Sequence, residues 1–266
     1  MTAAPATWWT TFFTEIYVDS DIELRDDAVA DDMSRCVTAA LRLEPGARLL
    51  DLACGTGRHA VRLSAAGFTV TGVDLVEEYL DRARLRAQAA HQPARFVQAD
   101  MRDLRALEPG SFDAVVSLHT SFGFFPSHEE NAGVLREIHR VLAPGGKVLI
   151  DVMNRDWFLR QTGVAFGVDQ TDFVIRNFDS STGRLYLHEE RFDPATSRIR
   201  WEIRSVGDQP RTVAADYRVY SAHELMAMLA ECGFAPTAVW GDYDLSPFSI
   251  HSPHIICVAT AAAGRA

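Results

Sequence analysis

The feature that most constrains the fold is a regular alternation of short apolar runs and amphipathic stretches between residues 48 and 152. Three stretches have the apolar spacing of surface helices, at residues 58–66, 77–90 and 128–142. Five apolar runs flank them and predict strands, at residues 48–53, 68–73, 94–98, 112–118 and 147–152. Strands that alternate with helices indicate βαβ units, a parallel sheet and right-handed crossovers.

The rhythm changes after about Asn154. Clusters of turn residues separate four predicted strands, at residues 172–178, 185–192, 199–206 and 214–220. A helix follows at residues 221–232, with Ser221 as its N-cap and Glu224 completing a capping box. Two last strands are predicted at residues 236–243 and 254–260. We therefore expect an antiparallel β cap, residues 161–220, inserted into an α/β core formed by residues 45–160 and 221–266.

The segment before the core, residues 1–44, is predicted to be mostly helical. Helical spacing runs through residues 5–44, and the first half is rich in aromatic residues. Pro45-Gly46 then ends the pattern. This N-terminal segment forms the third part of the predicted organisation.

Composition narrows the class of protein. The formal net charge is −10, and the 25 arginines and single lysine are scattered, so no nucleic-acid partner is expected. No apolar run is long enough for a membrane span, and no secretory signal is evident. The four cysteines and nine histidines show no metal-ligand spacing. We expect a cytoplasmic protein without a metal site; the sequence does not distinguish a monomer from a homo-oligomer.

The segment that carries chemical information is residues 49–58. An apolar strand contains Asp51 and leads into Gly55-Thr56-Gly57, where glycine lets the backbone approach a ligand closely. With Asp74 at the next strand end, the pattern also fits a dinucleotide-binding fingerprint. However, Asp51 and Asp100 would repel a pyrophosphate and would favour a cationic ligand.

Residues 49–58 resemble motif I of the class I S-adenosylmethionine-dependent methyltransferases. Further segments resemble the family's later motifs in the expected order, at residues 70–74, 96–101, 112–117 and 135–150. The resemblance covers about residues 45–155. It implies a Rossmann-like, seven-stranded, mostly parallel sheet with helices on both faces and an antiparallel last strand. One departure is Ala53, which replaces the first glycine of motif I and is expected to be tolerated.

The resemblance also implies the residues that bind S-adenosyl-L-methionine. Asp74 would hold the ribose hydroxyls, Asp100 would lie at the adenine, and Arg58 would either pair with the methionine carboxylate or be solvated. The full set of expected cofactor-binding residues is Asp51, Ala53, Gly55, Gly57, Arg58, Asp74, Leu75, Asp100, Met101 and Ser117.

Two residues are candidates for catalysis. His119 follows the fourth strand, where ligands bind in open α/β sheets, and its imidazole can accept a proton near neutral pH. The alternative is a histidine satisfied by the backbone. Tyr17 lies in the aromatic N-terminal segment, which folds over the cofactor in related small-molecule methyltransferases. The aromatic residues after the fourth strand would line the acceptor pocket or pack in the core; they are Phe122, Phe124 and Phe125. The sequence does not choose a site residue among those in or near the insert and the last two strands, namely His188, Tyr217, His251 and His254.

These observations favour an enzyme that methylates a small molecule, as in natural-product biosynthesis, with the insert roofing the acceptor. Transfer to nitrogen is favoured over transfer to oxygen or carbon. An RNA or protein methyltransferase is the first alternative, although Ser117-Leu118-His119-Thr120 stands where base-methylating enzymes carry Asn-Pro-Pro-Tyr or Asp-Pro-Pro-Tyr. An NAD-dependent oxidoreductase is the second.

Overall fold

The computed structural model describes residues 7–13, 22–164, 172–178 and 185–262, and it describes side chains for residues 7–13, 29–160 and 185–262. Tyr17 lies outside the described residues.

The core is a seven-stranded sheet with the order β10-β11-β5-β4-β1-β2-β3. Its strands are β1 (Arg48–Leu52), β2 (Thr69–Asp74), β3 (Ala94–Gln98), β4 (Phe112–Ser117), β5 (Leu142–Met153), β10 (Phe234–Trp240) and β11 (His254–Ala261). All neighbouring pairs are parallel except those of β11, which runs antiparallel to both β5 and β10. The predicted mostly parallel sheet with an antiparallel last strand is confirmed.

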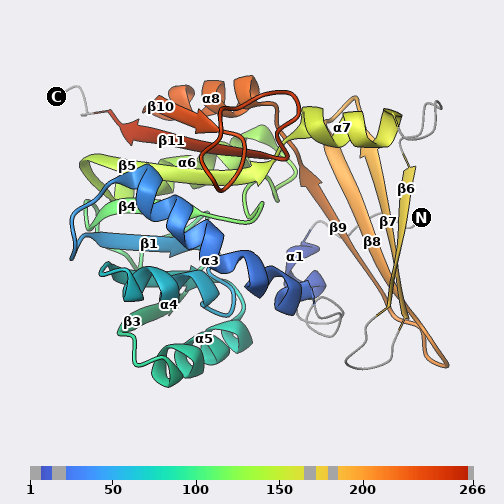
Figure 1. The fold of residues 1–266 in the computed structure, drawn as a ribbon, viewed down its shortest axis with the longest axis horizontal. Helices are drawn as coiled ribbons and strands as arrows, with labels where there is room; N and C mark the ends of the chain where they lie inside the picture. Colours follow the sequence, from blue (N-terminus) through green and yellow to red (C-terminus); the bar gives the residue numbers. More distant parts are fainter. Residues whose placement is uncertain (1–6, 14–21, 165–171, 179–184, 263–266) are drawn as a thin grey trace.

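Helices cover both faces of this sheet (Figure 1). On one face, α3 (Ile22–Leu41) and α4 (Arg58–Ala65) bury apolar side chains, and α5 (Glu77–Ala89) packs beside α4 and β3. On the other face lie α6 (His128–Val141) and α8 (Ala222–Glu231). Strand side chains alternate between the faces, so Leu49 packs in the apolar cluster under α3 and α4, and Leu50 packs in the cluster under α6 and α8. This double coverage buries most residues of the central strands β1 and β4 on both faces, as is usual for parallel strands.

The insert forms a second sheet of four antiparallel strands, in the order β6-β7-β8-β9. The strands are β6 (Asp172–Phe178), β7 (Leu185–Asp193), β8 (Arg198–Val206) and β9 (Thr212–Arg218). Figure 1 shows this sheet beside the carboxyl ends of the parallel strands, with the short helix α1 (Trp9–Phe12) between the two sheets. The sheet is connected to β5 through α7 (Arg155–Val164), a helix that the sequence pattern did not predict.

Local signals set the helix ends well. Ser127 and Glu130 form a capping box at the start of α6, and Ser221 and Glu224 form the predicted one at the start of α8. In contrast, β5 begins at Leu142 rather than at Lys147, because its pairing with β4 is irregular between these two positions. Among the described helices, none is long and apolar enough to cross a membrane.

Candidate active site

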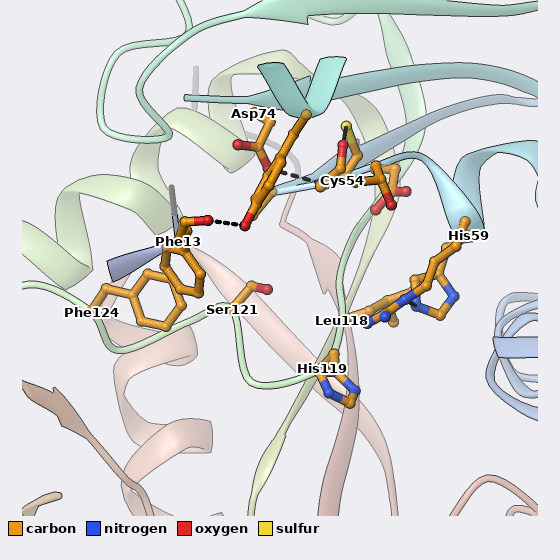
Figure 2. A pocket seen from close by; sticks show the side chains of 14 residues that line it. Phe13, Cys54, His59, Asp74, Leu118, His119, Ser121 and Phe124 are labelled. Atoms are coloured by element: carbon orange, nitrogen blue, oxygen red, sulfur yellow. Dashed lines mark hydrogen bonds between the residues drawn. The ribbon is translucent and has the colours of Figure 1, made fainter. Parts of the chain in front are cut away.

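Three neighbouring cavities lie at the carboxyl ends of the parallel strands. The first is formed by the ends of β1, β2 and β4 and by the start of α4, and Figure 2 shows the side chains that line it. The second lies between the ends of β2 and β3, and the third lies between α1, the loop after β4 and the β7–β9 face. Phe13 and Phe124 line all three. The cavities are therefore parts of one continuous site.

The turn after β1 is built from left-handed backbone. Ala53, Gly55 and Gly57 have φ values of 60°, 54° and 76°. A Cβ on Gly57 would lie 2.8 Å from the Cβ of Ala83 on α5, whereas a Cβ on Gly55 would meet no atom within 4 Å. Gly57 thus serves helix packing, and Gly55 leaves space at the cavity. Ala53 lines the first two cavities in a conformation that normally favours glycine.

Asp74 ties this turn to the end of β2. Its Oδ2 accepts the backbone N–H of Gly55 at 2.8 Å, and its Oδ1 accepts that of Val76 at 3.0 Å. Burial raises the pKa of Asp74, although these backbone N–H groups oppose the shift. Asp74 also lines the first and second cavities. The residue therefore has a structural role at the start of α5 and retains carboxylate lone pairs that a ligand hydroxyl can use.

Asp51 is a buried acid that lines the first cavity. It is 1% exposed, and among the described residues its Oδ2 has no hydrogen-bond partner. Burial raises the pKa of Asp51 to about 7, the negative charge of Asp74 adds to the rise, and Arg58 opposes it. A buried carboxylate oxygen of this kind is stabilised by a cationic donor. The ammonium group of S-adenosylmethionine fits this requirement.

The start of α4 supplies donors to the same cavity. Arg58 Nε donates to His59 Nε2 at 3.2 Å, which leaves the imidazole proton on Nδ1. Burial, and then the positive charge of Arg58, hold the pKa of the His59 imidazole far below its usual value. Its buried Nδ1 has no partner among the described residues. His59 is thus a neutral donor beside Arg58, and both suit a carboxylate; the sequence analysis did not select His59.

The second cavity is lined by Leu75, Asp100 and Met101, together with apolar side chains. Asp100 lies there as predicted, but Arg102 pairs with it at 2.7 Å. Burial raises the pKa of Asp100, yet the hydrogen bonds and charge of Arg102 outweigh it and bring the pKa below its usual value. Arg102 also lies 4.4 Å from the centre of the Phe125 ring. This ion pair neutralises the acid that was expected to add negative charge to the cleft.

The loop after β4 places His119 where the first and third cavities meet. His119 and Thr120 both have left-handed backbone, with φ values of 56° and 57°. Two successive residues in this conformation are strained and need support from their surroundings. Ser117, expected to bind cofactor, is 2% exposed at the end of β4 and does not line any of the three cavities. Leu118 and His119, which follow it, line the first cavity instead.

The third cavity has a volume of about 220 Å³ and mostly aromatic walls. Helix α1 and its N-cap contribute Phe12 and Trp8, and the inserted sheet contributes Trp201 and Tyr217. The rings of Phe12 and Trp201 lie 5.1 Å apart, which joins α1 to the insert. Of the four residues among which the sequence could not choose, His188, Tyr217, His251 and His254, only Tyr217 lines this cavity.

Comparisons with known proteins agree with this geometry. The family description "methyltransferase domain" matches residues 49–146. YqeM of Bacillus subtilis (strain 168), a protein named as a methyltransferase, is 31% identical over 224 residues, which cover 83% of this chain and 86% of YqeM. The glycine/sarcosine N-methyltransferase of Aphanothece halophytica is 39% identical over 198 residues, covering 74% of this chain and 69% of the relative.

A solved structure is similar along most of the chain. It is that of S-adenosylmethionine-bound CalS10, an amino pentose methyltransferase from Micromonospora echinaspora involved in calicheamicin biosynthesis. It superposes with a TM-score of 0.59 at 25% identity, and the match covers 88% of this chain and 90% of CalS10. The relatives point to the same family as the glycine turn after β1, the acids at the strand ends and the order of the sheet. The chain belongs to the S-adenosylmethionine-dependent methyltransferases.

Proposed function

We propose that this enzyme transfers a methyl group from S-adenosylmethionine to the nitrogen of a small molecule held in the third cavity. The observation that carries the proposal is the sharing of His119, Phe13 and Phe124 by the first and third cavities. A small acceptor in the third cavity would therefore contact the cofactor directly. Support for nitrogen comes from the glycine/sarcosine N-methyltransferase and amino pentose methyltransferase relatives.

The residues of the first two cavities would hold the cofactor in separate parts. Asp51 would bind the ammonium group, and Arg58 with His59 would bind the carboxylate. Asp74 would bind the ribose hydroxyls, and the second cavity would enclose the adenine between Leu75 and Met101. Gly55 and Ala53 would let the backbone pass close to the ligand. Once bound, S-adenosylmethionine supplies an electrophilic methyl group on its sulfonium.

The chain's contribution to catalysis is mainly positioning. Holding a nucleophile in line with a reacting carbon supplies several kcal/mol of the barrier, on the order of 7 or more in favourable cases. His119 lies between the two cavities, so its imidazole can orient the acceptor nitrogen and receive its proton. Tyr17, outside the described residues, stays a predicted contact with cofactor or acceptor.

The test is an assay of methyl transfer with paired amine and alcohol acceptors, read by mass spectrometry. We expect a mass gain of one methylene unit on the amines, with the methyl group located on nitrogen by NMR. Asp74→Ala should abolish turnover and weaken S-adenosylhomocysteine binding in calorimetry. The proposal fails if the wild-type enzyme methylates oxygen or carbon, or acts only on RNA or protein.

A further inference from the structure

The inserted sheet brings one unpaired carboxylate into the aromatic cavity. Glu190 lies on β7, directly opposite Trp201 on β8, and Trp201 lies opposite Ala215 on β9. All three residues line the third cavity, so they form one row across the face of the sheet that is turned toward α1. Along β7 the same face presents the buried side chains of Tyr186, His188 and Phe192. Glu190 is therefore an acid in an otherwise mostly apolar surface.

No described side chain neutralises this acid. On β7 and β8, Glu189 pairs with Arg191, Glu202 with Arg204 and Arg198 with Asp216, and none of these ion pairs involves Glu190. Burial alone raises the pKa of Glu190 to about 7. A carboxylate without a counter-ion in apolar surroundings is costly, and the cost is relieved when a cation binds beside it.

The walls of the cavity also favour a cation. Trp8, Phe12, Trp201 and Tyr217 surround the space that Glu190 faces. Aromatic faces attract ammonium groups, and aromatic boxes are a common way to bind substituted amines. A neutral acceptor would gain only apolar packing and a hydrogen bond from this combination of rings and carboxylate, and an anionic acceptor would be repelled by the carboxylate.

Resting on the proposed function, we propose that Glu190 is the counter-ion of the acceptor and selects a small aliphatic amine in its ammonium form. The carboxylate would hold the ammonium against the aromatic walls until His119, which lines the same cavity, accepts one proton from it. The nitrogen then has the lone pair that forms the new N–C bond, while the C–S bond breaks and its electron pair stays on sulfur. Glu190 is thus a specificity-determining residue, and the class of substrate is a primary or secondary amine rather than an alcohol or phenol.

The test compares amines with alcohols of the same shape. Cyclohexylamine is paired with cyclohexanol, and benzylamine with benzyl alcohol, and their binding is measured by calorimetry on protein saturated with S-adenosylhomocysteine. In the wild type, at least one amine should bind ten-fold or more tightly than its alcohol. Glu190→Gln, which keeps the size of the side chain, should remove this preference and leave alcohol binding within two-fold of wild type.

Two controls separate charge recognition from damage to the fold. Glu189→Gln alters the neighbouring acid, which pairs with Arg191, and should behave as wild type. Affinity for S-adenosylhomocysteine should stay unchanged in both variants, because neither residue lines the first two cavities. In turnover, Glu190→Gln should raise the KM for an amine far more than it lowers kcat.

A measurement on the unaltered enzyme gives a second readout. Amine binding should weaken between pH 8 and pH 6 as Glu190 becomes protonated, whereas alcohol binding should not. The other described titratable groups facing the cavity are His119 and Tyr217, and His188 lies two residues before Glu190 on the same face of β7. Glu190→Gln should remove most of the pH dependence if Glu190 rather than these groups is responsible.

The possible failures are distinguishable. If wild type binds amines no better than alcohols, or if Glu190→Gln keeps the preference, the assignment of Glu190 is overturned. If wild type and Glu190→Gln both methylate nitrogen with the same KM for the amine, the proposed function is supported and the role of Glu190 is refuted. Methylation of oxygen or carbon by wild type would refute both proposals.

Discussion

The carboxylate of Asp151, at the end of β5, accepts the backbone N–H of His119 at 2.9 Å. The carbonyl oxygen of Asp151 also accepts the N–H of Thr120 at 3.0 Å, so one residue holds both left-handed positions of the loop. The same carboxylate accepts the Tyr243 hydroxyl at 3.1 Å and lies 3.1 Å from His254 Nδ1. Asp151 is 1% exposed. The orientation of His119 therefore depends on a buried polar cluster behind it.

Replacing Asp151 by Asn should destabilise the protein and loosen the His119 loop. The Asn amide has one oxygen and one N–H₂ group, so one of the groups that now donate to the carboxylate would face another donor. A buried donor left without an acceptor costs about 1–3 kcal/mol. We expect the free energy of unfolding in urea to fall by about this amount and kcat to fall with little change in cofactor affinity. Tyr243→Phe removes one donor and should cost less. Asp156→Asn, at a partly exposed pair with Arg155 outside this cluster, should have little effect.

The destabilisation by Asp151→Asn should depend on pH through His254. Burial lowers the pKa of His254, but the hydrogen bond and charge of Asp151 outweigh it, and the net pKa is raised above 6.5. The stabilisation from this pair is complete below the unfolded pKa and disappears as the pH rises through the raised folded value. Urea unfolding should therefore show a larger loss at pH 6 than at pH 9. Equal losses at the two values would rule out a contribution from His254.

The two glycines of the cofactor turn should respond differently to substitution. In Gly57→Ala, the new Cβ would collide with Ala83 as well as adopt an unfavourable φ. We expect a loss of about 2 kcal/mol or more in unfolding free energy. In Gly55→Ala only the φ penalty applies, of about 1 kcal/mol, but the methyl group enters space at the cavity. Gly55→Ala should thus affect S-adenosylhomocysteine affinity more than stability, as calorimetry and thermal melts would show.

Ala53→Gly should stabilise the enzyme. Ala53 has a φ of 60°, where an L-residue with a Cβ loses about 1–2 kcal/mol relative to right-handed backbone. Glycine would relieve this strain at an entropic cost of about 0.5–1 kcal/mol, which leaves a net gain of up to about 1.5 kcal/mol. Ala39→Gly, at an exposed position of α3, should instead cost about 1 kcal/mol. If both variants are destabilised alike, Ala53 is not strained.

Cofactor affinity should rise with pH around neutrality because of Asp51. Its pKa is raised to about 7, and only the ionised carboxylate can pair with the ammonium of the ligand. Binding of S-adenosylhomocysteine should therefore weaken as the pH falls from 8 to 6, and Asp51→Asn should bind weakly at both values. The same raised pKa means that ionised Asp51 opposes folding, so the unliganded variant should be more stable than wild type above pH 7.

Much of the fold was predictable because its signals are local. Apolar periodicity gave the strands of the parallel sheet, and serine–glutamate spacing gave the capping box of α8. The turn around Gly55 and the strand-end acid Asp74 were likewise visible, since their chemistry depends on position relative to a strand. Helix α7 was missed because its charged, aromatic and glycine residues follow no regular helical spacing.

Other features depend on pairing that no local pattern reveals. Glu189 and Glu190 are adjacent and chemically identical, and only the register of β7 against β8 decides which one faces the aromatic cavity. The neutralisation of Asp100 by Arg102 and the burial of His59 also follow from packing. Ser117, expected to bind the cofactor, is buried at the end of β4, and the two residues that follow it, Leu118 and His119, line the first cavity.

The separation of the two sheets has an evolutionary consequence. Most contacts proposed for the cofactor come from the ends of β1, β2 and β3, whereas the β7–β9 face contributes Glu190, Trp201 and Tyr217 to the third cavity. Substitutions on the inserted sheet can therefore diversify the molecules that the enzyme accepts without disturbing the reagent that it consumes. A library confined to those strand positions is the natural starting point for evolving new methylation activities on this scaffold.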